Sequence, residues 1–246
     1  MQTLQKVKVK NVSQLKNCHK GRRCFLIGNG PSLSSIDLEK LRNEITFACN
    51  NVYLAFSETS WRPKYYTVSD PMVGKTFAQE INALALNKIF SSSVKPYFVD
   101  SPDILWLEQI HYASQDDISD FAFSFDLVDG VYHGATTLYI QLQIAFYMGI
   151  REVYLLGVDF DYTIPQEQER SGMGVLVKHK NEINHFHPDY RRPGERWWLA
   201  DKEFQYKTYA FAKGVFEEHG GKILNASRKT ALDVFPLVDL DATIVK

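Results

Sequence analysis

The feature that most constrains the fold is a short apolar segment that runs directly into a glycine-rich turn. Residues 24–27 (Cys-Phe-Leu-Ile) contain no charged side chain, which is typical of a strand buried on both faces. Residues 28–32 (Gly-Asn-Gly-Pro-Ser) then break the chain, and Ser32 is a natural N-cap for a following helix. A strand that enters a helix through such a turn presents backbone N–H groups to a phosphate. The turn matches neither GxGxxG nor GK[ST], so a tight turn without a ligand is the alternative interpretation.

Apolar segments and amphipathic segments alternate along the rest of the chain. Strands are predicted at 45–49, 65–68, 88–90, 96–99, 153–160 and 222–226, and helices at 33–41, 73–86, 134–148 and 199–218. This alternation is typical of a Rossmann-like α/β fold, with a mainly parallel sheet flanked by helices. Residues 161–200 show little periodicity, and an insertion of this length predicts a lid or a binding loop.

Length and composition predict one domain. A chain of 246 residues suits a single large core, so we expect a basic N-terminal arm at 1–21 and one Rossmann-like nucleotide-binding domain at 22–246, with its lid at about 161–200. A formal net charge of -1 argues against general nucleic-acid binding, and the cysteines form no CxxC pair that would predict a metal site. Neither a signal sequence nor a membrane-length apolar segment is recognisable, so we expect a cytoplasmic protein. Contact with the inner face of the membrane and homo-oligomerisation are both compatible with this composition.

Polar residues follow nearly every predicted strand. They are Asn29, Asn50 and Asn51, Ser69 and Asp70, Asp159 and Asp161, and Asn225 and Ser227. Each residue alone can be explained as a cap or a turn former. In parallel sheets, however, ligands bind at the carboxyl ends of the strands, so the recurrence favours a site for a polar nucleotide or sugar.

The lid and the start of the 134–148 helix supply further candidates. His185 and His187 are suited to accept a proton near neutral pH, and the neighbouring Tyr190, Arg191, Arg192 and Arg196 are suited to contact an anionic acceptor or leaving phosphate. Their spacing matches no established zinc pattern, and an exposed polar loop is the alternative. The hydroxyls of Thr136 and Thr137 predict a second anion site, unless they simply cap the helix.

Three short motifs together resemble a known superfamily. They are Ile-Gly-Asn-Gly-Pro-Ser-Leu at 27–33 with Ile36-Asp37, Cys49-Asn50, and Tyr-Leu-Leu-Gly-Val-Asp-Phe at 154–160. They resemble the bacterial sialyltransferases that use CMP-activated sugars, and also the MptE-like 6-hydroxymethylpterin diphosphokinases and the flagellin-glycosylating proteins. The resemblance covers roughly residues 22–160 and the last strand.

The resemblance to the sialyltransferases implies a metal-independent glycosyltransferase. It would move a sialic-acid-like sugar from a CMP donor to a bacterial surface glycan or glycolipid, with His187, or else His185, as general base and Tyr162 at the leaving phosphate. The nucleotide and donor contacts would come from Gly28, Asn29, Gly30, Ser32, Asn50, Asp70, Thr136, Thr137 and Asp159. Asp70 departs from the sialyltransferase pattern, which has Asn, and His-Gly-Ala-Thr at 133–136 replaces a Ser-Gly pair.

The superfamily leaves two other functions open. An MptE-like diphosphokinase would transfer pyrophosphate from ATP, with Mg²⁺ held by Asp70 or Asp159. A non-catalytic module that binds a nucleotide sugar is the other alternative.

Overall fold

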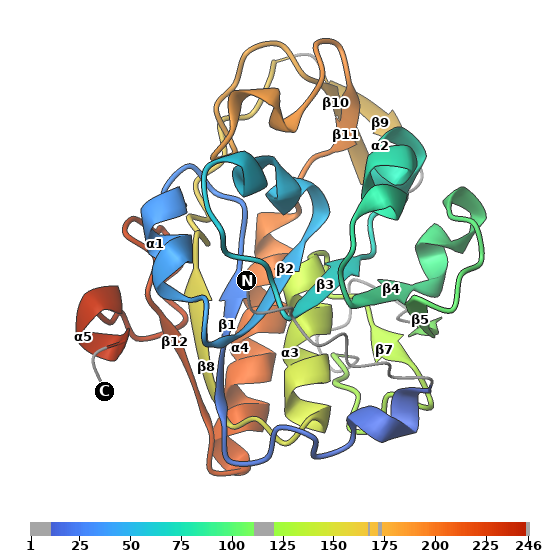
Figure 1. Cartoon of the computed structure of the whole chain (residues 1–246). Coiled ribbons are helices and arrows are strands. Elements are labelled where there is room, and N and C mark those ends of the chain that lie inside the picture. Colours follow the sequence, from blue (N-terminus) through green and yellow to red (C-terminus); the bar gives the residue numbers. More distant parts are fainter. Residues whose placement is uncertain (1–10, 111–120, 167, 172–173, 245–246) are drawn as a thin grey trace.

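A parallel sheet lies at the centre of the computed structural model, which describes residues 11–110, 121–166, 168–171 and 174–244 (Figure 1). Among these residues, seven strands form the sheet in the order β12-β8-β1-β2-β3-β4-β5. They are β1 (Arg23–Ile27), β2 (Ile45–Cys49), β3 (Tyr65–Val68), β4 (Lys88–Ser91), β5 (Ile104–Leu107), β8 (Glu152–Leu156) and β12 (Lys222–Asn225). The sheet confirms the predicted Rossmann-like α/β fold. Because β1 pairs with β2 on one side and with β8 on the other, the strand order reverses at β1.

Helices cover both faces of the sheet (Figure 1). Successive β1 side chains alternate between two apolar cores: Cys24 and Leu26 pack in one, and Phe25 and Ile27 in the other. The first core contains α3 (Thr137–Tyr147) and the apolar face of α4 (Lys202–Glu218). The second contains α1 (Ser35–Lys40), α2 (Pro71–Ala83) and the 3₁₀ segment η2 (Asn50–Ser57). Every residue of α3 is buried, so this helix has no solvent-facing stripe.

Three predicted elements differ from the observed ones. The strand predicted at 96–99 is absent, and Pro96 instead lies in the 3₁₀ helix η3 (Ser92–Tyr97); proline has no N–H to donate to a strand ladder. The strand predicted at 153–160 ends at Leu156, because Gly157 turns the chain with a φ of 69°. The N-cap of α1 is Ser34, whose side chain accepts the Asp37 N–H, and not Ser32.

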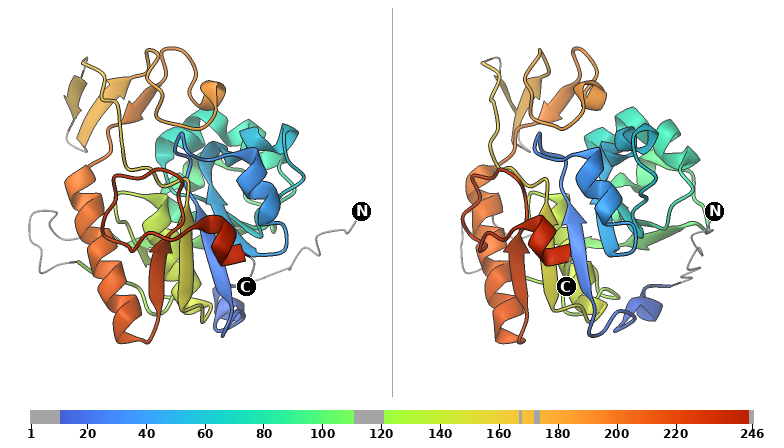
Figure 2. Two further views of the ribbon diagram at one scale, coloured as in Figure 1. Left: turned by 90° about the vertical axis from the view of Figure 1, so that its left-hand side faces the viewer. Right: turned by 60° about the vertical axis from the view of Figure 1, so that its left-hand side comes forward.

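Residues 161–200, predicted as a lid and called the lid below, contain a small sheet of their own. Its strands β9 (Gln168–Ser171), β10 (Gly174–Lys178) and β11 (Arg196–Trp198) pair antiparallel and lie beyond the carboxyl ends of the central strands (Figure 2). The lid is tied to the sheet edge by two hydrogen bonds. The Phe186 N–H donates to the Asn29 carbonyl at 3.0 Å, and the Asn51 side chain donates to the Tyr190 carbonyl at 2.8 Å.

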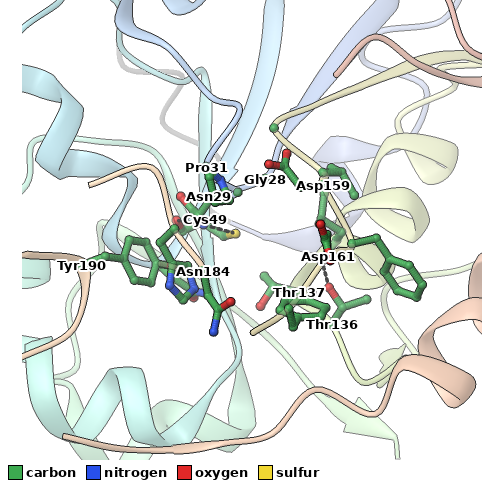
Figure 3. Close-up of a pocket in the computed structure, with 18 of the residues that line it drawn as sticks. Gly28, Asn29, Pro31, Cys49, Thr136, Thr137, Asp159, Asp161, Asn184 and Tyr190 are labelled. Atoms are coloured by element: carbon green, nitrogen blue, oxygen red, sulfur yellow. Dashed lines mark hydrogen bonds between the residues drawn. The ribbon is translucent and has the colours of Figure 1, made fainter. Parts of the chain in front are cut away.

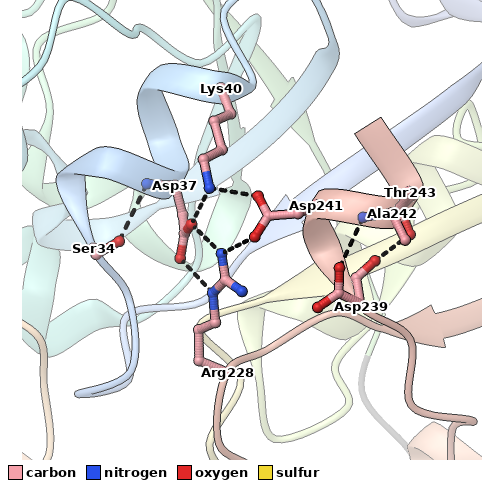
Figure 4. A network of polar contacts seen from close by, with 8 residues as sticks. All are labelled: Ser34, Asp37, Lys40, Arg228, Asp239, Asp241, Ala242 and Thr243. Atoms are coloured by element: carbon pink, nitrogen blue, oxygen red, sulfur yellow. Dashed lines mark hydrogen bonds and ion pairs between the residues drawn. The ribbon is translucent and has the colours of Figure 1, made fainter. Parts of the chain in front are cut away.

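An ionic cluster fastens the C-terminal segment to α1 (Figure 4). The Arg228 guanidinium contacts Asp37 at 2.7 and 3.0 Å and Asp241, next to the start of α5 (Leu240–Ile244), at 2.9 Å. Lys40 contacts both carboxylates from the other side. The hydrogen bonds from Arg228 lower the pKa of the Asp37 carboxyl, so this carboxyl stays ionised and the cluster stays intact at neutral pH.

The described part of the predicted arm, residues 11–21, packs against the domain. Leu15, in the 3₁₀ helix η1 (Val12–Leu15), belongs to the first core, and the N–H groups of Asn17 and His19 donate to the last carbonyls of the α3 region, Tyr147 and Met148. Residues 1–10 lie outside the described part. The short strands β6 (Gln109–Ile110) and β7 (Val131–Tyr132) pair beside this region. In the described ranges, no helix combines the length and the apolar character that a membrane span requires.

His19 makes the stability depend on pH. Burial, with the nearby charges of Lys64 and Arg22, lowers its pKa to about 4, and its Nε2 lies 2.8 Å from the Tyr65 hydroxyl. The unfolded chain binds a proton at His19 near pH 6.5 and the folded chain near pH 4, so this contribution is fully present above pH 6.5 and is lost as the pH falls from about 6.5 to about 4. We expect His19→Gln to flatten the fall of Tm between pH 7 and pH 4.5, as measured by scanning calorimetry. An unchanged slope would contradict this assignment.

A polar pocket at the carboxyl ends of the strands

A pocket opens where the strand order reverses, between the ends of β1 and β8 (Figure 3). It contains about 640 Å³ of empty space, including the part open to solvent. Six segments line it: the turn at 28–31 after β1, Cys49 and Asn50 after β2, residues 136–138 at the start of α3, residues 157–162 after β8, Asn184, His185 and Tyr190 of the lid, and Tyr209 of α4. The sheet topology thus brings together residues that are far apart in the sequence.

Three N–H groups of the glycine-rich turn are hydrogen-bonded within the protein. The N–H of Gly28 donates to the Leu156 carbonyl, that of Gly30 to the Gly157 carbonyl and that of Ser32 to Asp159 Oδ2, each at 2.8 Å. This corrects the expectation that these groups face a phosphate. The glycines instead allow the turn to pack closely against residues 157–159, because a Cβ at Gly30 would lie 2.6 Å from the Asp159 carboxylate. Ser32 stands behind the pocket lining, where its hydroxyl also donates to Asp159.

Two asparagines that line the pocket have buried side-chain oxygens without a partner in the described part of the chain. The Asn29 side chain donates to the Cys49 carbonyl at 3.3 Å, while its Oδ1 is buried without a partner in the described part of the chain. Asn50 Oδ1 is likewise buried and unpaired there, and Asn50 adopts the left-handed conformation with a φ of 51°. Because an unpaired buried acceptor is costly, both oxygens favour a ligand that supplies hydrogen-bond donors.

The start of α3, predicted as an anion site, lines the pocket. Thr136 is its N-cap and accepts the Leu138 N–H, while the Thr137 hydroxyl lies 2.7 Å from the Ser69 hydroxyl. Thr136, Thr137 and Leu138 all line the pocket, so the positive end of an 11-residue helix points at it. Ala135, just before the cap, has a φ of 53°, which is uncommon for a residue with a side chain.

The candidate carboxylates occupy different positions. Asp159 lines the pocket with both oxygens turned toward Ser32, and burial raises the pKa of its carboxyl. Asp161 also lines it, 3.4 Å from Lys229. Asp70 lies outside the lining, where its side chain caps α2 by accepting the Met72 N–H at 2.8 Å; burial raises its pKa. Within the described ranges, no group of three or more His, Cys, Asp or Glu side chains is arranged to hold a metal ion.

Of the two lid histidines predicted as candidate bases, one lines the pocket and the other does not. His185 lines the pocket and stacks on the Tyr190 ring, with 3.7 Å between the ring centroids and 4° between the planes. Burial lowers the pKa of His185 well below its usual value of 6.5, so its imidazole is neutral at pH 7. His187 lies outside the lining, and its Nδ1 accepts the Asp189 N–H at 3.1 Å to cap the short helix η5 (Pro188–Tyr190).

Tyr162 lies at the pocket, but the three arginines predicted from the sequence do not. Tyr162 lines the pocket, and burial raises its pKa to about 12, so it stays protonated and can donate a hydrogen bond. The three arginines lie outside the lining; two of them form ion pairs within the lid, and the third joins the lid to α2. Arg191 pairs with Glu195 at 3.1 Å and lies over the Trp197 ring, Arg192 pairs with Glu80 of α2, and Arg196 pairs with Glu169 at 2.7 Å.

Several lining residues were not among the site candidates predicted from the sequence, and Tyr209, Asn184 and Phe160 are three of them. Tyr209 lies on the buried side of α4, where its spacing resembles that of ordinary core residues. Asn184 is held by two hydrogen bonds to the Thr163 backbone, at 2.7 and 2.9 Å. Phe160 adopts a φ of 56°, and no local pattern signals this conformation.

Comparison with protein-family models gives one match. The model for the family described as 6-hydroxymethylpterin diphosphokinase MptE-like matches residues 1–165. The match includes the glycine-rich turn, the start of α3 and residues 157–162, but neither the lid strands nor α4. A search of curated protein sequences found no match.

Comparison with solved structures found proteins that resemble this chain in fold. The MAf glycosyltransferase from Magnetospirillum magneticum AMB-1 is 14% identical with a TM-score of 0.52; the match covers 95% of this chain and 38% of that one. The present chain therefore spans little more than a third of that protein, and the likeness shows a shared fold. Two structures of the sialyltransferase CstII from Campylobacter jejuni, one with cytidine-5'-monophosphate and one with CMP-3FNeuAc, give TM-scores of 0.44 and 0.47 at 14% and 15% identity. These matches cover 90% and 88% of this chain and 86% of each CstII chain.

Proposed function

Because the chain belongs to the 6-hydroxymethylpterin diphosphokinase MptE-like family, we propose that its pocket binds a nucleotide and that the protein is a glycosyltransferase using a CMP-activated, sialic-acid-like sugar. The acceptor in this proposal is a bacterial surface glycan or glycolipid. Sugar transfer is the activity named for MAf, whose fold this chain shares.

One observation carries the choice of donor. The N–H groups of Gly28, Gly30 and Ser32 are hydrogen-bonded within the protein, so these three groups form no phosphate cradle, and the anion site of this proposal is the start of α3. A triphosphate needs a cradle of several free donors, whereas the single phosphate of a CMP-sugar needs one such site. The unpaired oxygens of Asn29 and Asn50 suit the amino and hydroxyl groups of a nucleoside.

The chain's own residues suggest how transfer would proceed. The acceptor hydroxyl oxygen attacks the anomeric carbon of the donor sugar while the bond from that carbon to the CMP phosphate oxygen breaks. His185, neutral at pH 7 and facing the pocket, takes the hydroxyl proton. The departing phosphate is stabilised by the α3 N-terminus and by a hydrogen bond from the Tyr162 hydroxyl. His185 thus replaces His187 as our preferred base. The proposed reaction needs no metal.

The family description favours a second candidate, transfer of pyrophosphate from ATP with Mg²⁺. Mg²⁺ is usually held by one or two carboxylates together with substrate phosphates. Asp159 and Asp161 are the carboxylates of the described lining and would hold it, although Asp159 already accepts two hydrogen bonds from Ser32. Bound Mg²⁺ would neutralise charge on the transferred phosphates.

Thermal unfolding with added nucleotides distinguishes the two candidates, because a ligand that binds the native state raises Tm. The ligands are CMP, UDP, GDP and ATP, each with Mg²⁺ and with EDTA. We expect CMP to raise Tm in EDTA. Stabilisation by ATP alone, and only with Mg²⁺, would overturn the proposal in favour of the diphosphokinase.

Asn29→Ala tests the glycine-rich turn. The change removes the unpaired Oδ1 and the hydrogen bond to the Cys49 carbonyl, so we expect CMP to bind about tenfold more weakly in isothermal titration. Asn181→Ala, on the exposed part of the lid, is the matched control and should leave the affinity unchanged. If Asn29→Ala binds CMP as the wild type does, the turn is not part of the nucleotide site.

A further inference from the structure

The backbone just before α3 is strained, and α4 holds it in place. Ala135 has a φ of 53° although it carries a side chain, and a Cβ at the preceding Gly134 would overlap the Tyr139 ring. Non-glycine residues keep such a conformation only where their surroundings enforce it. The turn at 134–136 sets the direction of the α3 N-terminus, so whatever enforces its conformation also sets the geometry of the anion site.

Three α4 side chains contact this turn. Gln205 Nε2 donates to the Ala135 carbonyl at 2.7 Å, and the Thr208 hydroxyl donates to the Gly134 carbonyl at 3.2 Å. The Tyr209 hydroxyl lies 3.5 Å from the Thr136 hydroxyl. Gln205 is 5% exposed and Thr208 is fully buried, so water does not readily replace their hydrogen bonds.

Of these three side chains, Gln205 is the one that is hydrogen-bonded to the strained residue Ala135 itself. Its hydrogen bond fixes the orientation of the peptide group between Ala135 and Thr136, which is the group that turns the chain into the helix. Gln205 is absent from the pocket lining, so it acts on the site only through that peptide group.

We propose that Gln205 is a positioning residue, which holds the Ala135 turn in its left-handed conformation and thereby keeps the α3 N-terminus aimed at the phosphate of the nucleotide. This inference rests on the proposed nucleotide site. It adds a residue of α4, which lies outside the family match, to those that position the site.

Paired titrations of the full chain with CMP and with cytidine test this role, because only CMP carries the phosphate. Gln205→Met keeps the volume and removes the donor. We expect it to bind CMP about tenfold more weakly and cytidine within about twofold of the wild type. Lys207→Met, on the exposed face of α4 and paired only with Glu203 in the described contacts, is the control and should change neither affinity.

A second substitution separates positioning from general damage. Glycine adopts a positive φ without strain, so adding Ala135→Gly to Gln205→Met should restore most of the CMP affinity. Gln205→Asn, which keeps an amide but shortens its reach, should give the same split between CMP and cytidine, and it replaces Gln205→Met if that variant does not fold.

Equal losses for CMP and cytidine, an unchanged CMP affinity, or no rescue by Ala135→Gly would each overturn the positioning role while leaving the nucleotide site intact. If the wild-type protein binds CMP no better than cytidine, the pocket has no phosphate site, and both that site and the positioning role of Gln205 are wrong.

Discussion

His185→Ala is expected to lower the rate of sugar transfer by about 10²–10⁴-fold while CMP still binds, because general-base catalysis contributes on that order. His185 faces the pocket with a neutral imidazole, whereas His187 Nδ1 is occupied in capping η5. The measurement is kcat with a CMP-sugar donor together with the dissociation constant of CMP. His187→Ala is the matched control and should retain most of the activity.

The pH profile gives an independent check of this base. Burial lowers the pKa of His185, so a base at this position stays unprotonated below pH 6.5. We expect kcat/KM of the wild type to hold near its plateau at pH 6 and to fall only at lower pH, as His185 becomes protonated. A larger loss from His187→Ala than from His185→Ala would reassign the base to His187.

Gly28→Ala is expected to have the largest effect on stability. The added Cβ would collide with the backbone carbonyl of Gly157 and lie 2.9 Å from a Val158 methyl group. The main chain of a central strand cannot move aside, because Gly28 and β8 are joined by the 2.8 Å hydrogen bond from the Gly28 N–H to the Leu156 carbonyl. We expect a loss of about 3 kcal/mol in the free energy of unfolding, measured by urea denaturation.

Gly214→Ala is the matched control for this prediction. Gly214 lies inside α4 with no atom within 4 Å of an added Cβ, so alanine should stabilise the helix by up to about 1 kcal/mol. If Gly28→Ala were as stable as the wild type, the close contact between Gly28 and the Gly157 carbonyl would be contradicted.

Local patterns predicted the sheet and most of its strands. The apolar segments at 45–49 and 65–68 correspond to β2 and β3, because strands buried on both faces need continuous apolar residues. The polar residues after these strands also predicted the edge at which the pocket lies. Prediction was weaker elsewhere. The lid strands depend on pairing with one another across gaps in the sequence, and the strand predicted at 96–99 is absent because Pro96, at its start, lies in η3.

Roles within the site depended on tertiary contacts. Nothing local in the sequence distinguishes His185 from His187, or an arginine that pairs with Glu80 from one that contacts a ligand. The same holds for the glycine-rich turn, whose N–H groups find their acceptors in Leu156, Gly157 and Asp159, more than 120 positions further along the chain.

The sequence by itself determined the fold class, most strands of the central sheet and the edge of the sheet where polar residues collect, because strand burial and turn chemistry are local properties. Only the tertiary structure decided which groups face the pocket. A side chain or an N–H group is available to a ligand only if no other part of the protein has already formed a hydrogen bond with it, and here those partners lie just after β8, in the lid and on α4.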